Sequence, residues 1–154
     1  DTIIPIATAR KMQWNVDFLG SFASHNQIVI DKSGGATEGY YAISSVQIAY
    51  PDTATGEAKT FFTNYEAKYG TVPPEAAQLG YVFAQLLVHA LEKVGKKLTV
   101  ESLVKSLESI EGYPNIFGGS DISFSPTKHE GVSNSLLAQI QQGRWVTVNP
   151  SVSY

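Results

Sequence analysis

The fold is decided by one stretch near the C-terminus, Phe124-Ser-Pro-Thr-Lys-His-Glu-Gly-Val-Ser-Asn-Ser-Leu-Leu-Ala-Gln-Ile-Gln-Gln-Gly-Arg-Trp-Val-Thr-Val148. It opens with Ser125-Pro126-Thr127, which predicts a turn because proline fixes one backbone angle and hydroxyl side chains bond to the nearby backbone. Residues 135–141 predict a strand, Gln142-Gly143 a tight reversal, and residues 144–148 a returning strand. The chain is therefore expected to end in a β-hairpin.

Three amphipathic helices are predicted in the middle of the chain. Apolar side chains recur at helical spacing in three runs, over residues 58–69, 76–94 and 100–110. The first run stops at Gly70, a residue type that adopts the left-handed conformation of a helix C-cap without strain. Pro73-Pro74 starts the second run, which continues to Gly95. Thr99 is expected to cap the third helix, and Gly112 to end it.

Shorter elements are predicted on either side of these helices. They are a helix at residues 2–13, a strand at 18–19, a helix at 24–29, a strand at 39–46 and a strand at 122–124. Ser24 is expected to be the N-cap of the second short helix, because its hydroxyl can accept a hydrogen bond from a free backbone N–H group. A glycine-rich turn, Gly118-Gly119-Ser120-Asp121, leads into the last strand.

The composition is that of a soluble globular protein and excludes several functions. The net charge is −3 and the longest basic run is Gly95-Lys96-Lys97, so neither nucleic acid nor an anionic membrane is an expected partner. The sequence contains no cysteine, which excludes disulfides, thiolate catalysis and cysteine-ligated zinc. Its longest apolar stretch, Val82–Val88, is far shorter than the ~20 residues that a membrane-spanning helix needs.

Neither an enzyme nor a metal site is predicted. His25, His89 and His129 lie far apart, and none has a partner at metal-ligand spacing. Five glutamates fall on the polar faces of the predicted helices, where exposure to solvent explains them without acid–base catalysis: Glu57, Glu66, Glu92, Glu101 and Glu108. The sequence also lacks a nucleophile elbow, a phosphate-binding loop and a dinucleotide fingerprint. We therefore expect no catalytic residue and no cofactor.

Several short runs occur in an order and spacing that resemble a known family. The runs are Ala9-Arg10-Lys11-Met12, Asp17-Phe18-Leu19-Gly20, Thr37-Glu38-Gly39-Tyr40-Tyr41, the segment from Phe62 to Gly70, Leu79-Gly80-Tyr81, Leu91-Glu92-Lys93 and the C-terminal stretch quoted above. No run is diagnostic alone. Together, over residues 2–148, they resemble the branched-chain amino acid and aromatic-compound group of ABC-transporter solute-binding proteins, which have the type 1 periplasmic binding fold.

This resemblance implies an α/β fold of two lobes joined by three crossovers, with parallel sheets flanked by helices. Family members are longer and begin with a lobe that is missing here, so the chain resembles the C-terminal half of a receptor. Residues 1–48 and 125–154 are expected to be pieces of the C-terminal lobe, and residues 51–122 a helical piece of the N-terminal lobe. Two crossovers are expected near residues 46–52 and 118–126.

The loop that follows the strand at Phe18-Leu19 is the expected ligand-binding site, with Ser21, Phe22, Ala23 and Ser24 as its residues. It lies at the carboxyl end of a strand and before a predicted helix, where backbone N–H groups are free. In amino-acid-binding relatives this loop carries a glutamate that pairs with the ammonium group of the ligand, and Phe22 stands at the matching position. Alternative roles are packing under the sheet for Phe22 and helix capping for Ser21 and Ser24.

The resemblance implies a non-enzymatic receptor that binds a small carboxylate between two lobes and delivers it to an ABC permease in the membrane. Because Phe22 offers no counter-charge, an aromatic or apolar carboxylate is favoured over a free branched-chain amino acid. The expected location is the periplasm, or the outer surface of a Gram-positive cell through a lipid anchor. Residues 1–5 resemble no signal peptide, so an export signal is expected on residues upstream or already removed.

Three alternatives stay open at this point. A ligand-sensing regulatory module of the same fold would control a partner protein instead of feeding a transporter. A small α/β hydrolase or transferase would need a nucleophile with a base in reach. An incomplete receptor fragment would lack binding activity of its own, because the missing lobe segment or a companion chain would carry half of the pocket.

Overall fold

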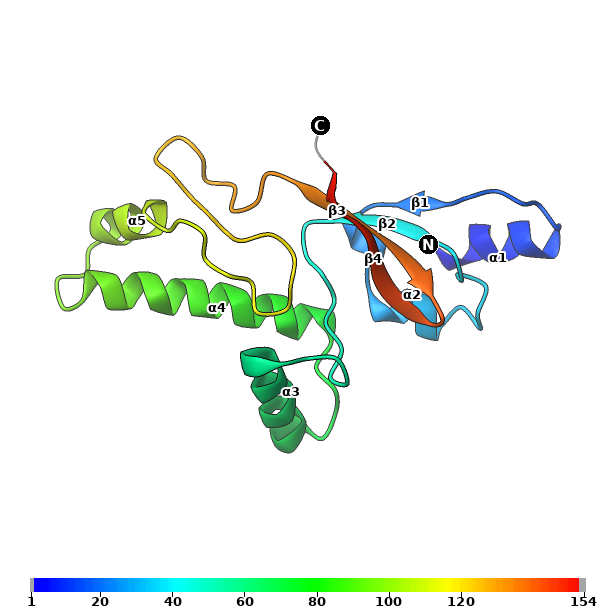
Figure 1. The fold of residues 1–154 in the computed structure, drawn as a ribbon, viewed down its shortest axis with the longest axis horizontal. Helices are drawn as coiled ribbons and strands as arrows, with labels where there is room; N and C mark the ends of the chain where they lie inside the picture. The colour runs from blue at the N-terminus through cyan, green and yellow to red at the C-terminus, as the bar shows by residue number, and fades with distance from the viewer. Residues whose placement is uncertain (1, 153–154) are drawn as a thin grey trace. The chain divides into compact units, whose positions relative to one another are not determined.

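The computed structural model describes residues 2–152, which form two compact units (Figure 1). Unit 1 contains the described residues up to Ile48 and those from Asn134 onward. Unit 2 contains Ala49–Ser133. Unit 2 is therefore a continuous insertion between the two segments of unit 1. Asp1, Ser153 and Tyr154, which the sequence analysis assigns to the C-terminal lobe, lie outside the described residues.

Unit 1 is built around a mixed four-stranded sheet. Its strands lie in the order β1 (Leu19–Gly20), β2 (Tyr41–Ser44), β3 (Ser135–Gln141) and β4 (Arg144–Val152). β1 is parallel to β2, whereas the pairs β2–β3 and β3–β4 are antiparallel. The α/β fold class and the C-terminal hairpin are thus confirmed, and the parallel part of the described sheet is the β1–β2 pair.

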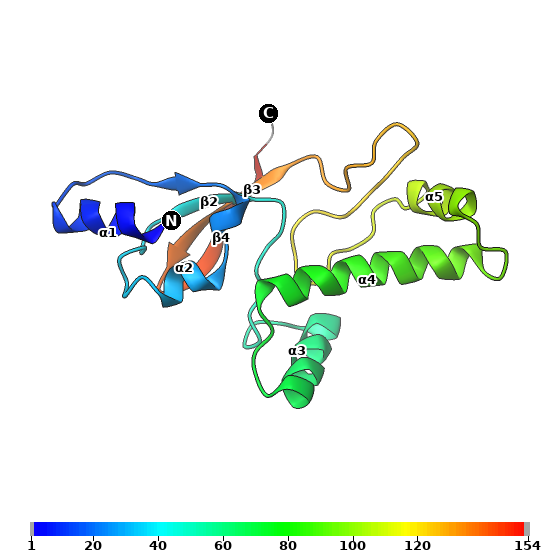
Figure 2. The same ribbon diagram turned by 180° about the vertical axis from the view of Figure 1, so that it is seen from behind.

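The β3–β4 hairpin forms where the sequence predicts it (Figure 2). Its turn residues Gln142 and Gly143 both have a positive φ, of 52° and 73°. Two positive φ angles in succession are what a tight hairpin turn requires, because they match the twist of the flanking strands. β4 continues to Val152, beyond the predicted end at Val148.

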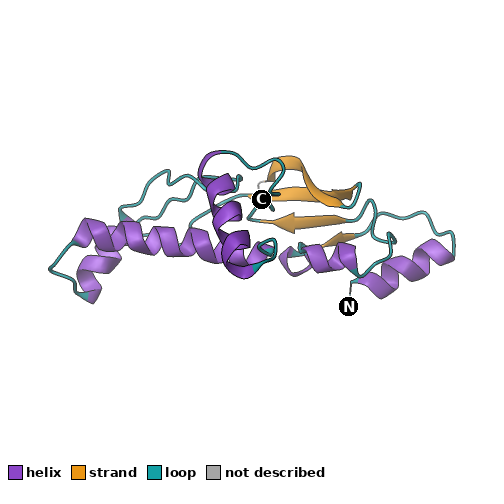
Figure 3. Ribbon diagram, turned by 90° about the horizontal axis from the view of Figure 1, so that it is seen from below, coloured by secondary structure: helices purple, strands orange, loops and turns teal. Residues whose placement is uncertain are grey.

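The helices of unit 1 are α1 (Ile3–Lys11), a short 3-10 turn η1 (Phe22–Ser24) and α2 (Gln27–Asp31). α1 and α2 lie on the same face of the sheet (Figure 3). Most buried apolar residues of unit 1 come from these helices and from alternate positions of the strands: Ile6, Ala9, Val29, Ala42, Leu136, Ala138, Ile140 and Trp145. Tyr40 and Ile48, which lie outside these elements, are buried as well. The core of unit 1 therefore lies between the sheet and the two helices.

Ser24 does not cap α2, contrary to the prediction. The N-cap is Asn26, whose Oδ1 accepts a hydrogen bond of 3.2 Å from the backbone N–H of Val29. The hydroxyl of Ser24 is used elsewhere, because it donates to the carbonyl of Ser21 and accepts from Tyr40. The helix consequently starts later than the sequence indicated.

Unit 2 contains the three predicted helices, α3 (Gly56–Tyr69), α4 (Glu75–Val94) and α5 (Val100–Glu108). Gly70 follows α3 in the left-handed conformation, with φ of 70°, as predicted. Thr99 caps α5 in a reciprocal capping box with Ser102. α5 ends at Glu108, before the predicted Gly112. The segment 122–124 forms no strand; Ile122 instead pairs with Tyr113 in an isolated bridge.

The core of unit 2 joins the helices to the loop that follows them. Its buried members are Ala58, Phe62, Val82, Leu86, Ala90, Ile110, Phe117 and Ile122. Phe124 and Val132 pack against this cluster, and the Ser123 N–H donates to the Gly131 carbonyl at 2.9 Å. These contacts hold residues 125–133 in unit 2, and the chain returns to unit 1 at Asn134. The two crossovers near residues 46–52 and 118–126 stay predictions. Which receptor lobe each unit belongs to stays a prediction.

Candidate functional site

The pairing of the strands brings three segments of unit 1 to one edge of the sheet. Leu19 pairs with Tyr41 in parallel register, so β1 and β2 end at the same edge. β3 is antiparallel to β2 and begins there, with Leu136 opposite Ser44. The carboxyl ends of parallel strands are where α/β sheets bind ligands, since the loops that follow them are free to diverge.

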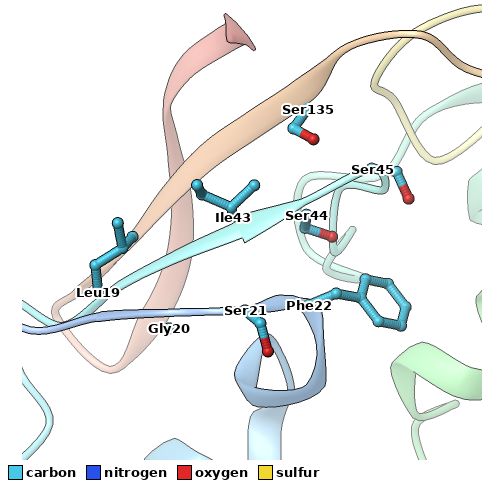
Figure 4. A pocket seen from close by; sticks show the side chains of 8 residues that line it. All are labelled: Leu19, Gly20, Ser21, Phe22, Ile43, Ser44, Ser45 and Ser135. Carbon is cyan, nitrogen blue, oxygen red and sulfur yellow. The ribbon is translucent and has the colours of Figure 1, made fainter. Parts of the chain in front are cut away.

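A concave pocket of ≈ 520 Å³ lies at this edge (Figure 4). It is lined by Leu19, Gly20, Ser21, Phe22, Ile43, Ser44, Ser45 and Ser135. Figure 4 shows the Phe22 ring extending toward the end of β2, where Ser44 and Ser45 lie. The lining thus combines apolar side chains with four serine hydroxyls and includes no ionisable side chain. Such a surface can donate hydrogen bonds to a polar or anionic group and stack on an apolar one, but it has no carboxylate to pair with a cation.

The structure brings two of the four predicted site residues to the pocket. Ser21 and Phe22 line it, and half of the Phe22 side chain is exposed. Ala23 and Ser24 are not among the lining residues. Ser24 is buried behind the turn, where its hydroxyl is bonded within unit 1.

Sequence reasoning missed the rest of the lining. Ser44 and Ser45 lie at the end of a predicted strand, and this pair of serines could have indicated that the strand end lines a pocket. Ser135 reaches the pocket only through the pairing of β2 with β3, about which local sequence says nothing.

The first two residues of η1, of which Phe22 lines the pocket, have backbone N–H groups that the turn itself does not use. In a 3-10 helix each N–H bonds to the carbonyl three residues earlier, and the first such bond here runs from the N–H of Ser24 to the carbonyl of Ser21, at 3.0 Å. The N–H groups of Phe22 and Ala23 therefore have no acceptor within the turn. They are suited to bind an anionic oxygen.

His25 follows η1 directly and is almost fully buried. Burial lowers its pKa to about 4, so the imidazole is neutral at physiological pH. Its ring packs edge-on against Trp145 with centroids 4.7 Å apart. Among the described residues its Nδ1 has no hydrogen-bond partner. His25 is thus a packing residue of the turn and not a ligand of the pocket.

Unit 2 has a smaller pocket, of ≈ 330 Å³, beside α4. Tyr81 contributes to it, and its ring packs at a tilt against that of Phe61 with centroids 4.6 Å apart. Burial and the nearby Glu57 carboxylate raise the pKa of Tyr81. Glu57 accepts hydrogen bonds from both Tyr81 and Gln85, so its charge is already engaged in joining α3 to α4.

No cluster of metal-ligating side chains occurs within residues 2–152. Nε2 of His129 lies 3.0 Å from Oε1 of Glu108, and the ring of His89 packs at a tilt against that of Tyr113. In the same part of the chain, none of the helices combines the length and apolar character needed to cross a membrane.

The sequence pattern of the family described as periplasmic binding protein matches residues 5–144, and the chain belongs to this family. Comparison with curated protein sequences gives no significant match.

Several solved ABC-transporter proteins share the fold. A branched-chain amino acid ABC transporter protein from Thermus thermophilus with bound valine gives a TM-score of 0.80 at 19% identity, over 97% of this chain and 42% of that chain. An R. palustris solute-binding protein in complex with benzoate gives a TM-score of 0.70 at 18% identity, over 99% of this chain and 41% of that chain. A branched-chain amino acid transporter substrate-binding protein from Streptococcus pneumoniae in complex with isoleucine gives a TM-score of 0.71 at 18% identity, over 97% of this chain and 42% of that chain.

These findings confirm the predicted family and the type 1 periplasmic binding fold, of which this chain forms a part. The chain spans about two fifths of the length of the solved structures it matches. At these identities the likeness establishes the fold, and the ligands belong to those proteins.

Proposed function

We propose that the chain is the solute-binding part of an extracytoplasmic receptor that serves an ABC importer. The pocket at the carboxyl ends of β1 and β2 carries the proposal, because it combines the usual place of a ligand site with a lining suited to binding. Its volume falls within the ~300–1,000 Å³ of small-molecule sites. Membership of the periplasmic binding protein family supports a receptor and not an enzyme.

The favoured solute is an aromatic or apolar carboxylate. A free amino acid brings an ammonium group, and enclosing that group without a counter-charge costs several kcal/mol. The lining of this pocket contains no carboxylate, whereas the exposed Phe22 ring offers a stacking surface worth about 0.5–1.5 kcal/mol beyond the area it buries. A branched-chain amino acid is the less favoured solute, and would need an acidic residue from outside unit 1.

We assign the polar end of the solute to the serine-lined edge. The hydroxyls of Ser21 and Ser45 and the N–H group of Phe22 would donate to its carboxylate. The Ser44 hydroxyl would only shape this edge, because it is buried and donates to the carbonyl of Val46 at 2.9 Å. Ser24 would act from behind the turn, since its hydroxyl is already bonded.

The rest of the cleft would come from polypeptide that these residues do not contain. The matched structures are more than twice as long as the part that this chain covers, which supports such a segment or companion chain. We propose that unit 1 belongs to the C-terminal lobe and unit 2 to the N-terminal lobe, joined near residues 46–52 and 133–134. The closed receptor would deliver its solute to the permease outside the cytoplasm, in the periplasm or on a lipid-anchored surface protein.

A titration followed by NMR tests this proposal on the chain itself. We expect benzoate to shift the amide resonances of residues 20–23 and 44–45, and valine at the same concentration to shift them less. Phe22→Ala should weaken benzoate binding by about 2- to 10-fold, because the stacking surface is lost. Phe83→Ala, at an exposed phenylalanine of α4 in unit 2, is the matched control and should leave the affinity unchanged.

Two results would contradict the proposal. If neither solute shifts these resonances up to millimolar concentration, the pocket is not a solute site of this chain. If valine binds more tightly than benzoate, the proposed ligand class is wrong.

A further inference from the structure

We propose that Tyr40 is a positioning residue of the pocket. Its hydroxyl binds Ser24 and thereby holds the turn η1, which presents Ser21 and Phe22 to the solute. This inference rests on the proposed function, because a positioned edge matters only if that edge binds a ligand.

A chain of hydrogen bonds leads from Tyr40 to the pocket edge. The Tyr40 hydroxyl lies 2.8 Å from Oγ of Ser24, which lies 2.7 Å from the carbonyl oxygen of Ser21. A carbonyl can only accept, so the Ser24 proton is directed to Ser21 and the Tyr40 hydroxyl must be the donor to Ser24. Hydrogen bonds in such a chain polarise one another and strengthen. Tyr40 and Ser24 are both buried, so water cannot replace the link.

Gly20 makes room for this link. A Cβ atom on Gly20 would overlap the Tyr40 hydroxyl and Oγ of Ser24. The tyrosine side chain therefore passes directly over the backbone of β1, immediately before the turn.

The turn needs this support because it cannot hold itself. η1 comprises only Phe22–Ser24, and a single 3-10 turn is far too short to be stable alone. Its two internal backbone bonds, from Ser24 to Ser21 and from His25 to Phe22, are both 3.0 Å long. Contacts from other segments must therefore decide whether they persist.

Tyr40 is itself anchored to the sheet. Its backbone carbonyl accepts the N–H of Ile140 at 2.9 Å, and its own N–H donates to Thr37 at 3.0 Å. Its ring packs edge-on against Trp145 with centroids 5.9 Å apart. Tyr40 thus connects the turn to the β3–β4 hairpin, which is the most extensively paired part of unit 1.

Tyr40→Phe tests the role, because it removes the hydroxyl and keeps the ring. Hydrogen exchange should accelerate about 5- to 10-fold at the amides of Ser24 and His25, whose bonds define the turn. Tyr41→Phe is the matched control: the neighbouring hydroxyl has no hydrogen bond within the described residues, and exchange in the turn should stay within about twofold of the original.

Ile6→Val, in α1, controls for general loss of stability. This buried substitution loosens the core of unit 1 without touching the turn. If it accelerates exchange at Ser24 and His25 as much as Tyr40→Phe does, Tyr40 is merely structural and the inference is wrong.

Benzoate titration of the same variants completes the test. We expect Tyr40→Phe to weaken binding about threefold or more, and Tyr41→Phe and Ile6→Val to leave it unchanged. Equal affinity of Tyr40→Phe and the unchanged chain would overturn the positioning role while the proposed function stands. If the unchanged chain binds neither benzoate nor valine, the proposed function fails and the positioning role fails with it, whatever the exchange data show.

Discussion

At the scale of single residues, His25 makes the stability of unit 1 depend on pH. Its imidazole is buried against Trp145, and burial lowers its pKa from 6.5 to about 4. In the unfolded chain the same side chain is exposed to water and has its ordinary pKa. The folded state therefore binds fewer protons than the unfolded state between pH 4 and 6.5.

From this difference we predict that the free energy of unfolding is insensitive to His25 above pH 6.5 and falls as the pH drops toward 4. Each pKa unit corresponds to about 1.4 kcal/mol, so the full loss is about 3 kcal/mol. Urea unfolding followed by tryptophan fluorescence at several pH values would measure it. His25→Phe should flatten the profile in this range, and His89→Phe, at an exposed histidine of α4, should not. An unchanged slope in His25→Phe would refute the assignment.

At the scale of elements, α5 depends on the capping box at its start. Oγ1 of Thr99 accepts the N–H of Ser102 at 3.1 Å, and Oγ of Ser102 accepts the N–H of Thr99 at 2.9 Å. The helix comprises only Val100–Glu108, so the two capped donors are a large part of its local support.

Thr99→Ala is accordingly predicted to destabilise the protein by about 1 kcal/mol. The matched change Thr63→Ala, at an exposed interior position of α3, should be neutral or slightly stabilising, because alanine has the higher helix propensity. Urea unfolding followed by far-UV circular dichroism would compare the two. Equal effects of the two substitutions would show that the cap contributes nothing.

At the scale of the whole molecule, each unit has a core of its own. Leu86 is buried in the core of unit 2, and Ile140 in that of unit 1. The sequence contains two tryptophans, Trp14 and Trp145, and both lie in unit 1. Tryptophan fluorescence therefore reports on unit 1, while most of the helical dichroism comes from unit 2.

At this scale we predict that Leu86→Ala lowers the free energy of unfolding of unit 2 by about 2–5 kcal/mol. The unfolding midpoint measured by dichroism should then fall, while the midpoint measured by fluorescence stays unchanged. Ile140→Ala should do the reverse. If either change shifts both midpoints together, the two units unfold as one.

Local signals predicted most elements of the fold. Gly70 and Thr99 act within one turn of helix, and Gln142-Gly143 reverses the chain by its own backbone angles, so their roles could be read without knowing what surrounds them. The role of Ser24 could not be predicted from its neighbours in sequence, because its hydroxyl accepts a hydrogen bond from Tyr40, which is distant in sequence.

The residues of the candidate site also differ in whether local sequence could predict them. Ser21 and Phe22 follow a predicted strand and a family pattern, and the structure places both at the pocket. Ser135 joins them only through strand register, and the return to unit 1 at Asn134 depends on packing of residues 125–133 against the helical core. Neither long-range pairing nor packing is encoded by short sequence patterns.

The insertion of unit 2 also orders events during synthesis. Ala49–Ser133 is contiguous, so unit 2 can collapse as soon as it leaves the ribosome. β2 must meanwhile wait for β3, because the strand that pairs with it begins only at Ser135. The pocket edge needs Ser135 beside Ser44, and Tyr40 bonded to Ile140, so it is completed only after unit 2 and β3 have been translated. A ribosome stalled before Ser135 would hold a folded helical unit and an unfinished binding site.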